Sequence, residues 1–311
     1  MADDRMRRIG RELLVSSFMG STIGADENWL LERMARSLEE YVASAGEVLF
    51  REGDAADYVY LMPEGRARMS RGGHSDWIYE GRWVIGTVDV QVGRPRARTA
   101  TIEQDARLFR YPGDMWNDVM EDSFEITVTA LTGSAGGTAA LYTRMAPEPA
   151  FPAPTDKPVL YDTSTLVGRA LLLSEVPLLR GAGVQALTDL AETTVSQPLA
   201  EAEYLFKPRS RHGRVHVVVH GEVEVFRDEP RATGRFGPGD VVGGALCLGT
   251  DDAWGARGVR DSEVLSFSVE EWFNQMEEHP EMARAAMTAL AIEREHLMER
   301  LADKLEEMVF R

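Results

Sequence analysis

The chain lacks most of what covalent cross-linking or membrane insertion would require. It has one cysteine, Cys247, among 311 residues, and a single thiol can form neither an intrachain disulfide nor a cysteine-based metal site. No apolar run approaches the roughly 18 residues that a membrane-spanning helix needs. We therefore expect a cytoplasmic protein whose thiol stays reduced.

Positive charge is also scarce. Lys and Arg number 34 against 51 Asp and Glu, which gives a net charge of −17, and acidic residues occur throughout both halves. Nucleic-acid affinity depends largely on basic side chains that neutralise phosphates, and an anionic membrane surface repels an acidic protein for the same reason. We expect neither nucleic acid nor membrane as a partner.

Motifs for catalysis are missing as well. The chain has no Gly-rich phosphate loop ending in Lys-Ser/Thr, no Gly-x-Ser-x-Gly elbow and no Cys–His pair typical of nucleophilic catalysis. His212, His216 and His220 have the four-residue spacing of a helical metal site, but they lie in a predicted strand. At about 3.3 Å per residue the outer two are about 26 Å apart, so we predict an exposed strand face and no metal site. Because the catalytic motifs are missing, we also predict that the protein is not an enzyme.

What the sequence does contain is an internal repeat. The stretches LFREGDAADYVYLMPEG and LFKPRSRHGRVHVVVHG start 156 residues apart, at positions 49 and 205, and Trp116 and Trp272 have the same separation. The offset becomes 157 where IG at 85–86 matches VG at 242–243. Matched segments over this distance indicate a duplicated unit rather than a solenoid, because only two copies occur.

Each copy has helices on either side of short strands. Apolar residues at three- and four-residue steps predict the helices, and β-branched runs bounded by turn residues predict the strands. The predicted elements are helices at 29–42, 183–195, 115–122 and 270–278, a hairpin or tight corner at 215–226, and a strand at 263–268. The glycines of TGSAGGT, 132–138, predict the interruption or end of a helix.

A proline-rich stretch, MAPEPAFPAPTDKPVL at 145–160, separates the two copies. Proline at this density excludes a helix and favours a semi-rigid extended linker. The predicted division of the chain is an N-terminal helix at 1–22, a first domain at 23–145, the linker at 146–162, a second domain at 163–278 and a C-terminal helix at 279–311.

The strand segments resemble those of the cyclic nucleotide-binding domain family. In the first copy the resemblance lies in GEVLFREGDAADYVYLMPEGRARM, 46–69, and in the second copy in VVVHGEVEVF, FGPGDVVGG and DSEVLSFS, which begin at 217, 236 and 261. The resemblance implies a mainly β fold with flanking helices, built from two tandem jelly-roll β-barrels and followed by a long amphipathic C-terminal helix.

The resemblance also implies where a ligand would bind. The family's phosphate-binding cassette has a Gly-Glu pair that opens a short helix, followed by an Arg before a small residue and Ala, so that helix amides and a guanidinium hold the cyclic phosphate. The matching residues of the first copy are Gly86, Thr87, Arg98, Thr99 and Ala100, with Arg96 as an alternative phosphate ligand. Thr87 replaces the Glu that would accept a hydrogen bond from the ribose, so a cyclic nucleotide such as cAMP or cGMP is a possible ligand here.

The second copy departs further from this pattern. Gly243-Gly244 replaces the Gly-Glu pair, and Trp254 stands where the first copy has Arg98. Two carboxylates, Asp251 and Asp252, lie where a phosphate would approach and would repel it. We expect no standard nucleotide site in this copy.

The C-terminal segment has the pattern of an amphipathic helix of about eight turns that starts at Pro280. Its recurring apolar residues are Met287, Leu290, Leu297, Leu301, Leu305 and Met308. In transcription regulators of the resembled family the corresponding helix forms a dimer seam and a DNA-binding winged helix follows it, whereas this sequence stops at Arg311. We expect a homo-oligomer or a protein partner on this helix, with packing on its own chain as the alternative.

Three functions are compatible with these features. We expect a non-enzymatic regulatory or adaptor protein that acts through protein–protein contacts. The alternative is a sensor of a cyclic nucleotide or related phosphate in the first copy, where ligand binding would shift the population of helix arrangements. A transcription regulator is the third possibility, and the acidic charge and missing reader domain count against it.

Overall fold

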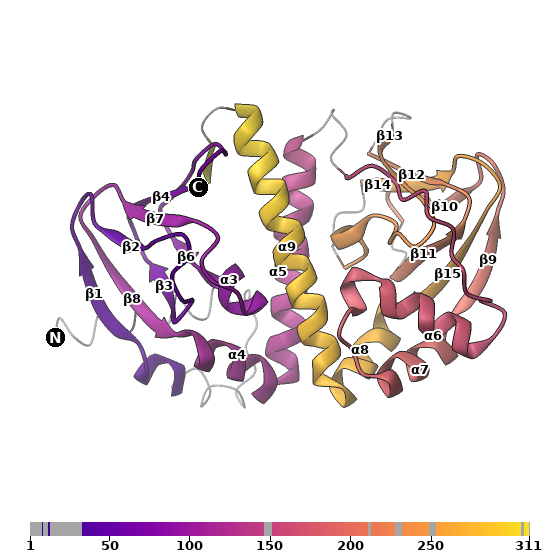
Figure 1. Ribbon diagram of the computed structural model, residues 1–311, viewed down its shortest axis with the longest axis horizontal. Coiled ribbons are helices and arrows are strands. Elements are labelled where there is room, and N and C mark those ends of the chain that lie inside the picture. The colour runs from indigo at the N-terminus through magenta and orange to yellow at the C-terminus, as the bar shows by residue number, and fades with distance from the viewer. Residues whose placement is uncertain are drawn as a thin grey trace. The chain divides into compact units, whose positions relative to one another are not determined.

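A computed structural model describes most of the chain (Figure 1). The described residues are Arg8, Glu12 and the ranges 33–145, 151–210, 213–227, 232–248, 253–305 and 308–310. The predicted N-terminal helix at 1–22 lies outside them, apart from Arg8 and Glu12. The backbone divides into two compact units, the first of residues 1–133 with 294–311 and the second of residues 134–293.

Unit 1 is a sandwich of two sheets. Its strands are β1 (Glu39–Ala43), β2 (Val48–Phe50), β3 (Tyr58–Met62), β4 (Arg66–Ser70), β5 (Trp77–Glu80), β6 (Trp83–Ile85), β7 (Thr99–Ile102), β8 (Ala106–Pro112) and β16 (Met308–Phe310). One sheet has the order β1-β8-β3-β6 and the other β16-β5-β4-β7-β2. The pairs are antiparallel except that of β16 with β5, which is parallel.

Helices complete unit 1. They are α3 (Thr87–Val92), α4 (Gly113–Asp122), the first part of α5 (Phe124–Met145) and the last part of α9 (Pro280–Leu305). Val59 and Leu61 of β3, Phe109 of β8 and Trp116 of α4 are all buried in one hydrophobic cluster. This burial of large apolar side chains between sheet and helix supplies the main driving force for folding of the unit.

Unit 2 repeats most of this order, with an isolated bridge between Val217 and Val241 in place of a strand that matches β6. Its strands are β9 (Val195–Leu199), β10 (Tyr204–Phe206), β11 (Arg214–His220), β12 (Val223–Arg227), β13 (Ala232–Phe236), β14 (Trp254–Gly258) and β15 (Ser262–Ser268), in sheets of order β10-β14-β12-β13 and β11-β15-β9. Its helices are the rest of α5, α6 (Leu166–Glu175), η2 (Pro177–Leu179), α7 (Val184–Glu192), η3 (Gly244–Cys247), α8 (Val269–Glu278) and the start of α9.

The duplication is confirmed element by element. Strands β1 and β9, β2 and β10, and β8 and β15 each start 156 residues apart, as do helices α4 and α8. The predicted fold class is therefore confirmed: two tandem jelly-roll-type β-sandwiches with flanking helices, including a long C-terminal helix. Among the described helices, none is long and apolar enough to cross a membrane.

The predicted corner at 215–226 is a corner and not a hairpin. Strands β11 and β12 lie in different sheets, and the chain turns between them at Gly221, whose φ is 90°. A Cβ on this glycine would approach the Cα of Ser262 to 2.6 Å. The positive φ and the close backbone approach together explain why glycine is needed here.

Two of the predicted helices need correction. The helix expected at 29–42 is helical only over 33–36 among the described residues, and Glu39–Ala43 is strand β1. Pairing with β8 satisfies its backbone, and Tyr41 and Val42 are residue types that favour strands. The break expected at 132–138 does not occur, because α5 runs unbroken from Phe124 to Met145. The reason is tertiary packing, since Ala135 and Ala139 are buried and compensate for the cost of the glycines.

The C-terminal segment is also different from the prediction. The helix ends at Leu305 rather than running to 311, and Met308–Phe310 forms β16. Leu290, Leu297 and Leu301 are buried within the chain, whereas Leu305 is 49% exposed. The burial of this apolar stripe favours the alternative in which the helix packs on its own chain.

The described part of the linker is non-helical, as predicted, but it is fixed to unit 2. Phe151 is buried and its ring stacks on Tyr142 with centroids 4.0 Å apart. Further along, the Thr155 N–H and hydroxyl both donate to the carboxylate of Asp240, at 2.9 and 2.8 Å. These contacts anchor the extended segment to the second sandwich.

Candidate functional site

The turn that opens α3 carries the first of the predicted site residues. Gly86 caps the helix with a φ of 86°, and Thr87 is the first helical residue and is half-buried. A Cβ at Gly86 would lie 2.6 Å from Nη1 of Arg96. The turn therefore needs glycine both for its left-handed backbone and for the close approach of that guanidinium.

Arg96 stabilises this turn through hydrogen bonds to backbone carbonyls. It is 2% exposed, and Nη1 donates to the Gly86 carbonyl at 2.7 Å while Nη2 donates to the carbonyl of Tyr58. Its guanidinium lies 4.2 Å from the centre of the Phe50 ring. Burial lowers the pKa of Arg96, and the Asp89 carboxylate partly offsets that effect. Because both of its Nη groups donate to backbone carbonyls, Arg96 is the weaker of the two candidates for a phosphate ligand.

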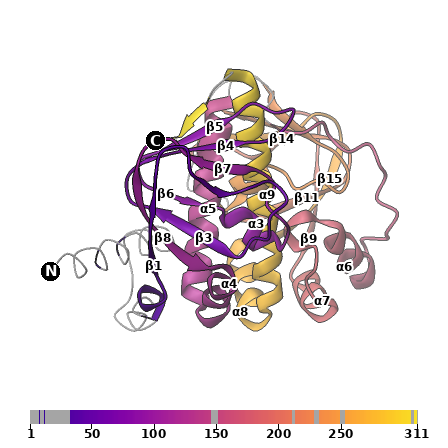
Figure 2. The same cartoon turned by 60° about the vertical axis from the view of Figure 1, so that its left-hand side comes forward.

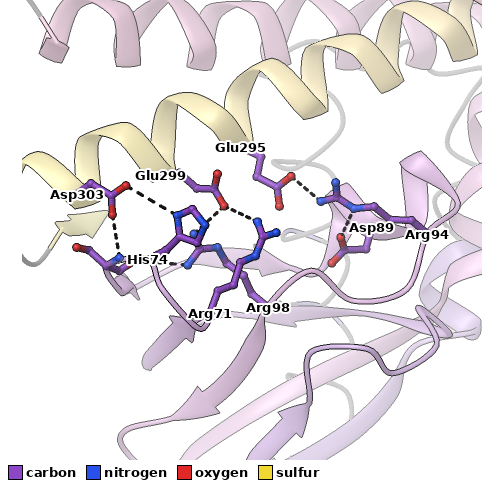
Figure 3. Close-up of polar contacts among 9 residues, drawn as sticks. Arg71, His74, Asp89, Arg94, Arg98, Glu295, Glu299 and Asp303 are labelled. Carbon is purple, nitrogen blue, oxygen red and sulfur yellow. Dashed lines mark hydrogen bonds and ion pairs between the residues drawn. The ribbon is translucent and has the colours of Figure 1, made fainter.

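Arg98 is buried but meets a carboxylate instead (Figure 3). It is 2% exposed, and Nη2 donates to Oε1 of Glu299 at 2.9 Å. Nη1 donates to the Ser75 carbonyl at 3.4 Å, and the guanidinium carbon lies 3.8 Å from the centre of the Trp77 ring. Within the described part of the chain, Nε of Arg98 has no hydrogen-bond partner. The guanidinium that the family pattern assigns to a phosphate thus holds an anion from its own chain.

The remaining predicted residues follow Arg98 directly. Thr99 opens β7, and its hydroxyl accepts a hydrogen bond from the Glu52 N–H at 3.0 Å. Ala100 is fully buried within β7, opposite Met69 of β4. The structure brings Gly86 into contact with Arg96, and it positions Thr99 and Ala100 in the strand rather than at a charged group.

Sequence reasoning missed the partners of these arginines on α9. We call Glu295, Glu299 and Asp303 the acidic row, and Arg71, Arg94 and Arg98 the basic row. Arg94 pairs with Glu295 at 2.5 Å and with Asp89 of α3 at 2.9 Å, Arg71 pairs with Glu299 at 3.0 Å, and the Ser75 N–H donates to Asp303 at 2.9 Å. The four-residue spacing of the acidic row was the available signal, because it places all three carboxylates on one helix face.

The charges of the two rows stabilise one another. Burial alone would raise the pKa of Glu299, but the hydrogen bonds and charges of Arg98 and Arg71 outweigh it and hold that pKa below its ordinary value. Burial likewise would lower the pKa of Arg94, whereas Glu295 and Asp89 raise it by more. Both shifts follow from opposite charges at hydrogen-bond distance in a partly desolvated place.

The corresponding turn of unit 2 also receives a carboxylate from α9. Gly243 and Gly244 have φ values of 81° and 50° and open η3. The Ala245 N–H donates to Oε1 of Glu293 at 3.1 Å, and the Tyr142 hydroxyl donates to the same oxygen at 2.5 Å. An anion at the amide that opens a helical turn is the arrangement by which such turns bind phosphate.

Titration in this second turn favours neutral groups. Removal from water raises the pKa of Glu293, and the hydrogen bonds from Tyr142 and Ala245 only partly counter it. Burial, together with the nearby Glu293 charge, raises the pKa of the Cys247 thiol to about 12. The single cysteine is therefore a buried, unreactive thiol.

The other second-copy residues that match the cassette positions make contacts within unit 2. Trp254, at the position of Arg98, is 2% exposed and has its ring edge against Phe151, with centroids 6.2 Å apart. Arg257 lies in β14 and pairs with Glu224 at 2.5 Å. Asp251 and Asp252 lie outside the described residues.

The histidines do not form the exposed face that was predicted. His216 is 4% exposed, and its Nδ1 lies 2.7 Å from the Ser266 hydroxyl. His220 is exposed and lies near Glu263, and His212 is outside the described residues. The correction has a simple cause, since β11 is covered on both sides over Val215–Val219. Over the part of the chain that the structure describes, no group of three or more His, Cys, Asp or Glu could hold a metal ion.

Comparison with known proteins agrees with this architecture. The family model for the cyclic nucleotide-binding domain matches residues 42–123 and 196–279, which we call domain 1 and domain 2. No curated protein matches the chain in sequence.

Solved structures with a similar fold include regulatory subunits of protein kinase A. The regulatory domain of Toxoplasma gondii protein kinase A with cAMP is 16% identical, over 87% of this chain and 92% of that one, with a TM-score of 0.34. The regulatory subunit of a cAMP-independent protein kinase A from Trypanosoma brucei, as a mutant bound to cAMP, is 12% identical over 96% and 92%, with a TM-score of 0.34.

A cAMP-binding acyltransferase from Mycobacterium smegmatis is 19% identical over 44% of this chain and 43% of that one, with a TM-score of 0.34. At these identities and scores the neighbours identify no ligand or partner for this chain. The family model covers more than half of its residues, in the order and spacing of the duplicated sandwiches. The chain therefore belongs to the cyclic nucleotide-binding domain family and contains two copies of the domain.

Proposed function

We propose that this is a non-enzymatic regulatory protein that acts through protein–protein contacts and whose domains do not depend on a cyclic nucleotide. The observation that carries the proposal is the ion pair of Arg98 with Glu299, 2.9 Å long and largely shielded from water. The guanidinium that a cyclic phosphate would need is already neutralised by the chain itself. A free ligand must displace this tethered carboxylate, which acts at a high effective concentration.

Domain 2 supports the same proposal from different residues. In its cassette turn the Ala245 N–H donates a hydrogen bond to Glu293. A buried tryptophan, Trp254, stands at the position of the phosphate-binding arginine. A second anion at that turn would have to replace Glu293, whose oxygen already accepts the hydrogen bond of the Ala245 N–H. Both domains then serve as packing and contact surfaces.

Isothermal titration calorimetry tests the proposal. We expect wild-type protein to give no saturable heat with cAMP, cGMP or a cyclic dinucleotide at ligand concentrations up to about 1 mM. Thr87→Glu, which restores the carboxylate of the family pattern, should not create binding alone, because Glu299 still neutralises Arg98. Saturable binding of any of these nucleotides by the wild type would reject the proposal.

A sensor function in domain 1 is the second candidate. It is favoured by Nε of Arg98, which has no hydrogen-bond partner among the described residues, because a phosphate can accept from Nε and an Nη of one arginine together. Gly86, Thr87, Arg98, Thr99 and Ala100 would then form the site, and ligand would displace Glu299. In that case the heat from cAMP is lost in Arg98→Ala but kept in Arg107→Ala, a control whose side chain is 64% exposed.

Oligomer formation through α9 stays a prediction from the sequence. Leu305 is the member of the predicted apolar seam that is 49% exposed, so a seam in solution would have to use it. If dimers form there, Leu305→Lys should shift the mass measured by light scattering from dimer to monomer, with the exposed Val42→Lys as control. A wild-type monomer at all concentrations would exclude this interface. The cytoplasmic location likewise stays a prediction.

A further inference from the structure

The end of α9 approaches domain 1 as a charged helix face. The acidic row meets the basic row through pairs at 2.5, 2.9 and 3.0 Å, and Asp303 accepts from the Ser75 N–H and lies 3.9 Å from His74 (Figure 3). The next row of this helix is apolar, since Leu297, Met298 and Leu301 are each less than 5% exposed. One helix face thus supplies carboxylates at three successive turns and an apolar edge beside them.

After α9 the same segment adds a strand to the sheet. β16 pairs in parallel with β5, with Met308 opposite Trp77 and Phe310 opposite Tyr79. Figure 2 shows β16 beside β5 at the edge of the sheet. Met308 and Phe310 are 1% and 4% exposed, and the Phe310 ring lies 6.1 Å from that of Trp83. The edge strand β5 is therefore paired on its outer side by a segment more than 220 residues away in sequence.

We infer that domain 1 is a peptide-recognition domain whose ligand is the C-terminal part of this chain, the end of α9 at 295–305 and strand β16 at 308–310. The ligand class is an acidic helix with carboxylates at four-residue spacing, followed by a short apolar strand. The inference rests on the proposed function and deepens it, because it names what fills the place of a nucleotide. It joins two ways in which proteins bind peptides, a helix laid in a groove and a strand added to a sheet edge.

Charge and burial make the contact a site rather than incidental packing. Arg98 is 2% exposed and contacts both the Trp77 ring and Glu299. The domain therefore supplies a cation–π contact to the guanidinium, and the peptide supplies the carboxylate that pairs with it. Without the peptide, Arg98 would be a shielded cation with no anionic partner, and an unpaired buried charge lowers the stability of the folded state. Phe310 is 4% exposed and its ring lies beside those of Tyr79 and Trp83, so it anchors β16 at the edge of the sheet.

The test adds the segment in trans to the full-length protein. A fluorescent peptide of residues 291–311 is titrated into wild type, where the tethered copy competes, and into Glu295→Gln/Glu299→Gln/Asp303→Asn, where the tethered copy is weakened. We expect the peptide to bind the variant at least tenfold more tightly than the wild type, by fluorescence anisotropy. Glu39→Gln/Glu40→Gln/Glu52→Gln is the matched control for net charge, because these three residues are exposed, and it should behave as wild type.

A second variant covers the possibility that the neutralised protein does not fold. Met308→Ser/Phe310→Ser leaves the acidic row intact and removes the apolar anchor, and circular dichroism checks its fold. Peptide binding to this variant, lost when the peptide carries the same Gln and Asn substitutions, supports the inference. If neither folded variant binds the peptide, or if the substituted peptide binds equally well, the inference is wrong. Transfer of the segment between two chains would appear as a dimer in light scattering and would support the same recognition.

The failure of the inference can be told apart from that of the proposed function. If the wild type binds cAMP in calorimetry and the variants bind the peptide, the inferred peptide site stands and the proposed ligand-independent function is wrong. If the wild type binds no nucleotide and the variants bind no peptide, the proposed function stands and the inferred peptide site is wrong. Competition between cAMP and the peptide on the variants would show that both use Arg98.

Discussion

Glu299→Ala should lower the free energy of unfolding by about 2–4 kcal/mol. The substitution leaves Arg98, which is 2% exposed, without its carboxylate and beneath the Trp77 ring. Arg71, the second partner of Glu299, is 37% exposed and can be hydrated, so it adds little to the loss. Urea denaturation monitored by tryptophan fluorescence measures the change.

The matched control is Glu40→Ala. Glu40 pairs with Arg107 at 3.2 Å, but the two side chains are 40% and 64% exposed, and such surface pairs contribute between 0 and about 1 kcal/mol. A second variant, Arg98→Met/Glu299→Leu, should recover most of the loss, since replacing both members of a shielded pair by apolar groups is often nearly neutral. Equal losses in Glu299→Ala and Glu40→Ala would contradict the buried pair.

The same pair gives a pH dependence. The pKa of Glu299 is held below its ordinary value of 4.5 by Arg98 and Arg71 against the opposing effect of burial. A carboxyl with a lowered pKa in the folded state stabilises the protein above pH 4.5, and this contribution is lost as the pH falls through the lowered value. The stability difference between wild type and Glu299→Gln should therefore shrink below about pH 4.5.

The repeat was visible in the sequence because the turns depend on residues that few others can replace. Gly221 turns between two sheets with a φ of 90° and no room for a Cβ, and its counterpart Gly65 has a φ of 147°. Such positions hold their residue type in both copies. The strands between them keep their order because the core must be filled in the same way.

The partner of Arg98 in the first cassette could not be predicted from the sequence in the same way. Arg98 and Glu299 are 201 residues apart, and carboxylates at four-residue spacing on an amphipathic helix are typical of a solvated face. A sequence shows which charges share a face but not which cation they meet. The error over Glu39–Ala43 has a related cause, since pairing with β8 is a tertiary contact that local periodicity does not contain.

The other large effect is expected in unit 2, on Glu293. Glu293→Ala removes the acceptor of two hydrogen bonds, from the Tyr142 hydroxyl at 2.5 Å and the Ala245 N–H at 3.1 Å. Tyr142 and Ala245 are 2% and 0% exposed, so the loss should be about 1–3 kcal/mol in the free energy of unfolding. Glu293→Gln keeps a carbonyl oxygen for both donors and is the matched control.

Ionisation of Glu293 gives the domain 2 turn a pH dependence of its own, which a comparison of wild type with Glu293→Gln measures. Removal from water raises the pKa of Glu293 above its ordinary value of 4.5, despite its two hydrogen bonds. A carboxyl with a raised pKa in the folded state costs stability as the pH rises through the interval between the unfolded and folded values. Thermal unfolding should therefore give Glu293→Gln a higher Tm than wild type at pH 8, by roughly 2–4 °C for each kcal/mol, and equal Tm values near pH 4. A Tm difference that does not change with pH would mean that Glu293 titrates normally, and the carboxylate would then occupy the domain 2 turn as an ordinary surface charge.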